Sequence, residues 1–144
     1  MRYWDTSALL PLLIQEPMTS AMRDHLADDS AVVTWWGTRI EAVSALARLE
    51  RDGDIEADML RRTLHGLEAN ARHWLEVPAI EDVRLQATRL LRVHRLRAAD
   101  ALQLAAAIIA SDFAPGTLPF VTLDERLAVA ADREGFRVLG ASLC

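Results

Sequence analysis

The sequence predicts an α/β protein in which a mostly parallel central sheet is covered by helices on both faces. Segments with strand character alternate with segments of helical periodicity along the chain, an order typical of parallel sheets. The chain has 144 residues, of which 51% are hydrophobic. That is enough to bury the core of a single domain over residues 1–144. No linker, repeat or low-complexity segment divides it.

The first half of the chain begins with an apolar strand that ends at Asp5. Helices are expected at residues 6–14 and 19–28, and the run of apolar residues at 31–34 predicts a short buried strand. Gly37 and Thr38 open a helix that continues through Glu50 and ends near Gly53. A further helix is expected over residues 55–72.

The second half begins with a weak strand at residues 74–77, which Pro78 closes. The pattern of residues 80–94 predicts an amphipathic helix, and residues 98–112 predict a helix that is apolar nearly all round and therefore buried. A loop at residues 113–116 ends it, because it contains Pro115 and Gly116. A strand at residues 119–122, a helix at 124–134 and a last strand at 136–139 complete the prediction.

Composition argues against several classes of function. The net charge of -5 disfavours a protein that coats nucleic acid without sequence preference. No apolar run approaches the roughly 20 residues of a membrane span, and no signal peptide is indicated, so we expect a cytoplasmic protein. The one cysteine, Cys144, is the last residue of the sequence, so we expect neither a disulfide framework nor a thiolate metal site within one chain.

Asp5 stands where a strand turns into a helix, at the carboxyl edge of the sheet, where open α/β folds bind their ligands. A phosphoaspartate enzyme of the haloacid-dehalogenase type would need a second acid two residues later, and Ser7 occupies that position. Those enzymes and receiver domains also rely on a lysine, whereas all 16 basic residues here are arginine. We therefore expect chemistry at Asp5 other than phosphoryl capture.

Three other acids, Glu41, Asp100 and Asp124, also lie at the boundaries of expected elements. Each has a structural alternative. Residues 38–41 and 122–125 match the S/T-x-x-E capping box, and a helix dipole or Arg97 could satisfy Asp100. However, Asp100 lies on the apolar helix, and a buried carboxylate is costly unless it is paired or binds a metal. The functional interpretation is a shared acidic site.

Four segments resemble, in order and spacing, those of the PIN-domain ribonucleases, and the closest likeness is to the VapC toxins of prokaryotic toxin–antitoxin pairs. The segments are residues 4–9, 41–46, 97–105 and 121–127. The resemblance covers the chain from Arg2 to about Leu139. It implies a PIN-like domain with a Mg²⁺ or Mn²⁺ site, and the matching acids are Asp5, Glu41, Asp100 and Asp124. Ser7 and Thr122 match hydroxyl positions beside these acids. No acid is missing, so the motifs imply an active member.

The residue types agree with that implication. Mg²⁺ prefers oxygen ligands and keeps several waters. Zinc is disfavoured, because the four histidines show no i,i+4 pair and the one cysteine is terminal. Clustered carboxylates repel one another, which raises some of their pKa values until a cation binds. One or two bound ions could activate a water that hydrolyses a phosphodiester, and the family implies a 5′-phosphate product.

A basic segment, residues 84–97, precedes Asp100 and contains no acid. Its five arginines are Arg84, Arg89, Arg92, Arg95 and Arg97. The first four fall on one side of a helix, opposite a stripe formed by Ala87, Leu90, Leu91 and Val93. We predict that the arginines contact RNA phosphates or acidic groups of a partner. A merely solvated face is the alternative.

The resemblance also implies a homodimer and a cognate antitoxin whose basic arm covers the acidic pocket. Of the adjacent Trp35 and Trp36, which should point to different sides of the chain, we expect one in the core and the other at a subunit interface. The preferred function is a toxin that cleaves RNA. The alternatives are a housekeeping RNA-processing nuclease and a non-catalytic module that docks a basic peptide in the acidic pocket.

Overall fold

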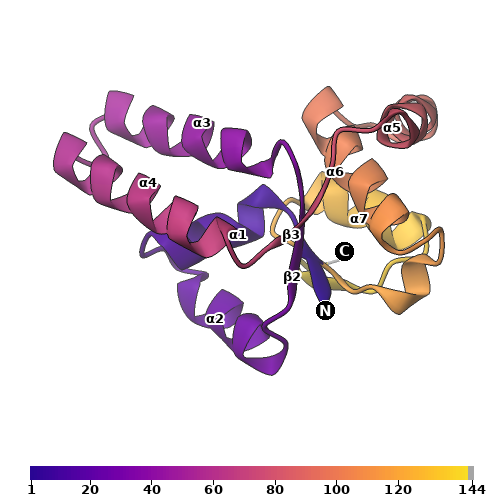
Figure 1. Ribbon diagram of the computed structural model, residues 1–144, viewed down its shortest axis with the longest axis horizontal. Coiled ribbons are helices and arrows are strands. Elements are labelled where there is room, and N and C mark those ends of the chain that lie inside the picture. The colour runs from indigo at the N-terminus through magenta and orange to yellow at the C-terminus, as the bar shows by residue number, and fades with distance from the viewer. Residues whose placement is uncertain (143–144) are drawn as a thin grey trace.

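A computed structural model describes residues 1–142 and contains a five-stranded sheet in which every pairing is parallel (Figure 1). The strand order is β3-β2-β1-β4-β5, so the first strand of the chain is the central one. The prediction of a mostly parallel sheet is confirmed. The strands are β1 (Arg2–Trp4), β2 (Val32–Trp35), β3 (Leu75–Val77), β4 (Phe120–Thr122) and β5 (Val138–Gly140). Cys144 lies outside the described residues.

The seven predicted helices are present, each within a few residues of its expected bounds. They are α1 (Thr6–Leu13), α2 (Thr19–Asp28), α3 (Thr38–Arg51), α4 (Ala57–Ala71), α5 (Glu81–Val93), α6 (Ala98–Ala110) and α7 (Glu125–Arg133). A short 3-10 turn, η1 (Pro115–Thr117), overlaps the end of the loop predicted at residues 113–116. Among residues 1–142, no helix has both the length and the hydropathy required to cross a membrane.

Side chains alternate along β1 and reach two separate cores. Tyr3 points to the face covered by α5, α6 and α7, where its ring stacks on Phe120 with centroids 5.1 Å apart. Trp4 points to the opposite face and packs with Leu9 of α1 and Met22 of α2. Tyr3 and Trp4 are both fully buried. The prediction that helices cover both faces of the sheet is therefore confirmed.

Helices α3 and α4 form a hairpin that packs against α1 and extends away from the sheet (Figure 1). Trp35 ends β2 in the core, with 7% of its surface exposed, whereas Trp36 is 51% exposed. The prediction that these tryptophans point to different sides is confirmed. A side chain at Gly37 would meet the Trp35 indole at 2.4 Å, so the turn from β2 into α3 requires glycine.

Candidate active site

Asp5 lies at the carboxyl end of β1 and is 5% exposed. Thr122 Oγ1 donates to Asp5 Oδ2 at 2.6 Å, and the Ser7 hydroxyl donates to the same oxygen. Burial raises the pKa of Asp5 to about 6. The hydrogen bonds from Ser7 and Thr122 oppose this shift, and the charge of Glu41 adds to it. Asp5 is therefore a desolvated acid that two hydroxyls help to keep ionised.

Backbone donors orient both hydroxyls toward Asp5. Ser7, in the first turn of α1, accepts a hydrogen bond from the Leu123 backbone N–H at 2.9 Å. Thr122, at the end of β4, accepts one from the Asp124 backbone N–H at 3.1 Å. Each hydroxyl can then turn its own proton toward the carboxylate. These hydrogen bonds link the turn that follows β4 to Asp5. Ser7 and Thr122, the two hydroxyls predicted to lie beside the acids, both contact Asp5.

Glu41 projects from the first turns of α3 and is half-buried. Its Oε2 accepts hydrogen bonds from Thr6 Oγ1 at 2.6 Å and from Gln103 Nε2 at 2.8 Å. Burial is the largest cause that raises the pKa of Glu41, and the charge of Asp100 adds to it, whereas the two hydrogen bonds lower it. Like Asp5, Glu41 is a partly desolvated acid that accepts hydrogen bonds from uncharged side chains.

Gln103, on α6, is a site residue that the sequence interpretation missed. It is 1% exposed, and besides Glu41 its Nε2 donates to Thr38 Oγ1 at 3.0 Å. Its Oε1 accepts a hydrogen bond from the Tyr3 hydroxyl at 2.6 Å. Gln103 therefore fixes the Glu41 carboxylate relative to β1 and α3. It is the only polar residue between Ala101 and Ala110, and that interruption of an apolar run was the available signal.

Asp100 and Asp124 line one hollow at the edge of the molecule. Asp100 lies in the first turn of α6 and is half-buried. Burial, and then the charge of Asp124, raises the pKa of Asp100, whereas Arg97 and Arg126 lower it. Asp124 is the N-cap of α7, and its Oδ1 accepts a hydrogen bond from the Leu127 backbone N–H at 2.9 Å. One of its oxygens is thus committed to the helix.

Neither predicted capping box is formed. Helix α3 has Gly37 as its N-cap and no side-chain capping bond, and the Glu41 carboxylate is bound by groups from α1 and α6 instead. In α7 the capping side chain is Asp124, whereas the Thr122 hydroxyl binds Asp5. The capping interpretation is therefore wrong for Glu41. Asp124 does cap a helix, but it is itself the N-cap of α7, a position that the predicted box gave to Thr122.

The four acids influence one another in series. Charge effects on the pKa values link Asp5 with Glu41, Glu41 with Asp100, and Asp100 with Asp124. Within residues 1–142, none of the four forms an ion pair. No three Asp, Glu, His or Cys side chains of these residues gather into a group that could hold a metal ion. Each acid thus acts on the charge of the next, and the joint coordination of an ion by all four stays a prediction.

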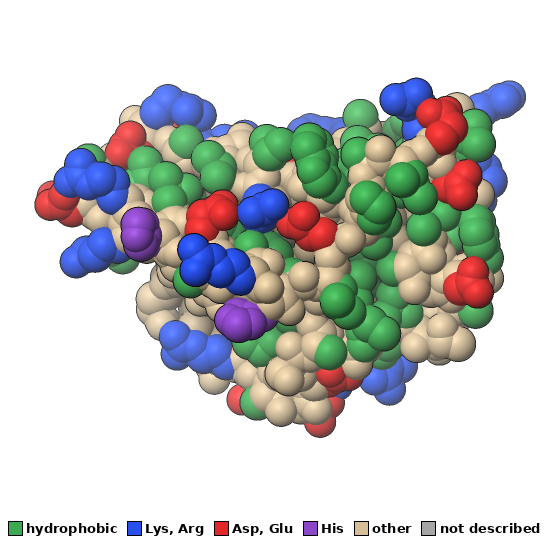
Figure 2. Space-filling model, in the orientation of Figure 1, with side chains coloured by type: hydrophobic (Ala, Val, Ile, Leu, Met, Phe, Trp, Pro, Cys, Tyr) green, Lys and Arg blue, Asp and Glu red, His purple; other side chains and the backbone are tan. Residues whose placement is uncertain are grey.

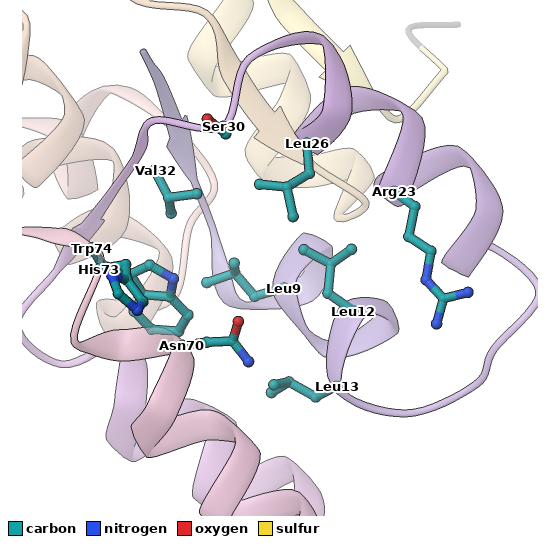
Figure 3. A pocket seen from close by; sticks show the side chains of 10 residues that line it. All are labelled: Leu9, Leu12, Leu13, Arg23, Leu26, Ser30, Val32, Asn70, His73 and Trp74. Carbon is teal, nitrogen blue, oxygen red and sulfur yellow. The ribbon is translucent and has the colours of Figure 1, made fainter.

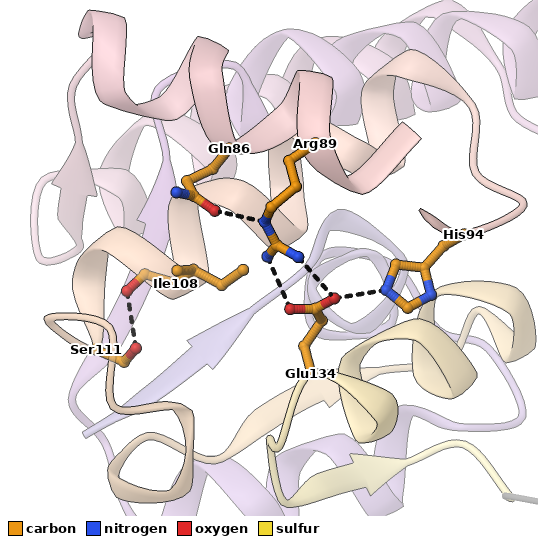
Figure 4. A network of polar contacts seen from close by, with 6 residues as sticks. All are labelled: Gln86, Arg89, His94, Ile108, Ser111 and Glu134. Atoms are coloured by element: carbon orange, nitrogen blue, oxygen red, sulfur yellow. Dashed lines mark hydrogen bonds and ion pairs between the residues drawn. The ribbon is translucent and has the colours of Figure 1, made fainter. Parts of the chain in front are cut away.

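Two of the five predicted contact arginines have partners within the chain. Arg84 pairs with Glu81 at 2.9 Å. Arg89 binds Glu134 through two hydrogen bonds of 2.8 and 3.2 Å, and His94 Nε2 lies 2.6 Å from the same carboxylate (Figure 4). The Arg89 hydrogen bond is the largest cause that lowers the pKa of Glu134. Within residues 1–142, Arg92, Arg95 and Arg97 form no ion pair.

The predicted apolar stripe of α5 is correct for Ala87 and Leu90, which are buried, and wrong for Leu91 and Val93. The latter two are 43% and 61% exposed. Leu91 directly follows the buried Leu90 and is therefore turned about 100° away from the contact with α6. Val93 is the last residue of the helix. Leu91 and Val93 therefore offer apolar surface to solvent.

A separate apolar hollow lies between α1, α2 and the end of α4 (Figure 3). Leu9, Leu12 and Leu26 line it, with Trp74 on the opposite side and Arg23 at its margin. No Asp or Glu of the described part of the chain, residues 1–142, lines this hollow. It therefore lacks the chemistry expected of the acidic site.

Gln103→Leu should lower the free energy of unfolding by about 2 kcal/mol, because it removes the partners of buried hydroxyls and of Glu41. Urea unfolding in the presence of a chelator measures this. Gln86→Leu is the matched control, since Gln86 is only half-buried on α5 and binds the exposed Arg89. An equal loss of unfolding free energy in both variants would show that the contacts of Gln103 stabilise the fold no more than those of Gln86.

No model of a known protein family matches the chain. Two solved structures are similar over 97% of this chain and 97% of the other: a toxin–antitoxin complex from Klebsiella pneumoniae (17% identity, TM-score 0.63) and FitAcB from Neisseria gonorrhoeae (20% identity, TM-score 0.69). At these identities they support the fold. A relative in sequence is Ribonuclease VapC47 from Mycobacterium tuberculosis (strain CDC 1551 / Oshkosh), which is 33% identical over 142 residues, with 94% of this chain and 93% of that protein covered. With the strand order and the acids at the sheet edge, this match shows that the chain belongs to the VapC ribonuclease family.

Proposed function

We propose that this protein is the toxin of a type II toxin–antitoxin pair and a metal-dependent endoribonuclease. The observation that carries the proposal is the Asp5 carboxylate, which is buried, has a raised pKa and forms no ion pair within residues 1–142. Such a group favours a bound cation. The relative named above is a ribonuclease, and the Klebsiella structure is a toxin–antitoxin complex. Both names support this assignment.

The donor set fits Mg²⁺, with Mn²⁺ as a possible substitute. Asp5, Glu41, Asp100 and Asp124 offer only carboxylate oxygens, which hard divalent ions prefer. When bound, the ion supplies an activated water for hydrolysis of the RNA phosphodiester and stabilises the leaving oxygen. The expected products carry a 5′-phosphate.

The neutral groups of the site orient its acids. Ser7 and Thr122 hold one oxygen of Asp5 and favour its ionised form. Gln103 does the same for Glu41 and is itself fixed by the Tyr3 hydroxyl. Because these donors come from the protein interior, the acids need little rearrangement of the backbone when substrate arrives. Ser7, Thr122 and Gln103 are therefore positioning residues in this proposal.

A homodimer and a cognate antitoxin belong to the same proposal. Trp36, Ile40 and Val43 are 51%, 61% and 39% exposed and border a shallow hollow with Arg39. Figure 2 shows hydrophobic side chains gathered over α3 on this face. Exposed aromatic and aliphatic side chains of this kind are typical of subunit interfaces. The acids at the sheet edge offer the charge that a basic antitoxin arm would bind.

Expression of the chain alone should arrest bacterial growth, and co-expression of its antitoxin should restore it. Viable counts after induction measure the effect, with Asp5→Asn as the control because it removes one charge from the proposed site. Equal growth of cells that express wild type and Asp5→Asn would contradict the toxin assignment. RNA cleavage that persists without toxicity would then favour a housekeeping nuclease.

A further inference from the structure

Two adjoining hollows beside α7 form one groove that begins at the acids. The first contains Asp100 and Asp124 together with Arg97. The second lies between the end of α5 and the outer side of α7. Glu125 and Arg126 line both hollows, so the second continues the first. The acidic site therefore opens into an extended groove.

Beyond the proposed metal site, the charged residues that line the groove are mainly arginines. Arg95, Arg97, Arg126 and Arg133 line it and are exposed. None of them forms an ion pair within residues 1–142. Outside the proposed metal site, Glu125 is the only acid among residues 1–142 that lines the two hollows. The groove is therefore basic although the protein as a whole is acidic.

Apolar surface accompanies these charges. Val93 and Val129 line the second hollow and are 61% and 37% exposed. Single-stranded nucleic acid presents phosphates together with unstacked bases, which rest on apolar side chains, whereas a duplex hides its base faces. Beyond the acids, Arg95 and Arg133 would repel a basic peptide. The combination of guanidinium groups and exposed valines matches a single strand.

We propose that this groove binds single-stranded RNA beside the cleavage position. Arg97 and Arg126 hold the phosphates next to the acids, and Arg95 and Arg133 hold phosphates further along the strand. The strand's bases or riboses cover Val93 and Val129. This inference rests on the proposed function and adds the residues that hold the RNA strand and the path that the strand follows.

The test measures binding of a labelled single-stranded RNA to the Asp5→Asn protein by fluorescence anisotropy over a salt series, so that the RNA is not consumed. Two pairs of groove substitutions are compared, Arg97→Gln with Arg126→Gln and Arg95→Gln with Arg133→Gln. The matched control replaces Arg48 and Arg51, which are exposed near the end of α3, with glutamine. A third pair, Arg84→Gln with Arg92→Gln, tests the face of α5 outside the groove.

Each groove pair should raise the Kd at least tenfold and reduce the slope of log K against log salt by about 1.4, the value for two lost phosphate contacts with a single strand. The Arg48 and Arg51 control pair should change the Kd less than about twofold, and the Arg84 and Arg92 pair should raise it less than either groove pair does. Unchanged binding by the groove pairs, or equal losses in all pairs, would overturn the groove. The proposed function is separate: wild type that binds RNA through the groove but never cleaves it with Mg²⁺ or Mn²⁺ would refute the nuclease alone.

Discussion

Asp5→Asn and Asp100→Asn should each lower the rate of RNA cleavage more than about a hundredfold. Loss of a group that only orients a metal ligand costs at most about that much, so a larger loss indicates a ligand itself. Both substitutions remove a negative charge from the proposed metal ligands while keeping the shape of the side chain. The measurement is cleavage of structured and unstructured RNAs by purified protein with Mg²⁺ or Mn²⁺, compared with the same reaction containing a chelator. Binding of Mn²⁺ by calorimetry provides a second readout.

The control for both variants is Asp24→Asn, which makes the same change at an exposed position of α2. It should cleave like wild type. If Asp5→Asn and Asp100→Asn retain cleavage at saturating Mn²⁺, in preparations free of contaminating nuclease, the proposed site is wrong. Loss of Mn²⁺ binding without loss of folding would separate a ligand role from a structural one.

Asp5→Asn should also stabilise the metal-free protein at pH 7 by up to about 3 kcal/mol. Burial raises the pKa of Asp5 from 3.8 to about 6, so below pH 3.8 the acid is protonated in both states and has no effect. Between pH 3.8 and about 6 the unfolded chain ionises Asp5 while the folded protein keeps it protonated, so stability falls as the pH rises through this window. Asparagine has no such charge, and the substitution therefore removes this part of the pH dependence.

Urea unfolding at pH 4 and pH 7 with a chelator measures the difference. Glu134→Gln should behave oppositely, because Arg89 lowers the pKa of Glu134, whose contribution is present at pH 7 and is lost as the pH falls. Added Mn²⁺ should stabilise wild type at pH 7 more than Asp5→Asn. If the difference in stability between wild type and Asp5→Asn is the same at pH 7 as at pH 4, burial does not raise the pKa of Asp5.

The sequence was sufficient to predict the order of elements, the parallel sheet and the position of four acids at element boundaries, because these features depend on local periodicity and on strand ends. The groups that orient the acids were not predictable in this way. Thr122 resembled a local cap, but its hydroxyl binds Asp5, 117 residues away. Glu41 likewise resembled a capping acid, but it is bound by Gln103, 62 residues away. A local motif cannot reveal partners that only the folded sheet brings together.

The basic segment shows the same limit for charges. Arg89 belonged to the predicted contact face, but its carboxylate partner Glu134 lies 45 residues later in the chain. Arg126 is not among the predicted contact arginines, although it follows Asp124 by two residues and lies in the first turn of α7. Helical periodicity identified which arginines share a face. Which of them meet an acid depends on how the fold places α5 relative to later residues such as Glu134.

The central position of β1 affects when during synthesis the site can exist. Strand β1 is made first and has β2 as one neighbour, but its other neighbour, β4, begins only at Phe120. Until the ribosome has produced β4 and the turn after it, Asp5 lacks the Thr122 hydroxyl and the neighbouring Asp124. The acids and the α7 arginines of the groove therefore come together late in translation. A nascent or truncated chain that ends before β4 should be harmless to the cell that makes it.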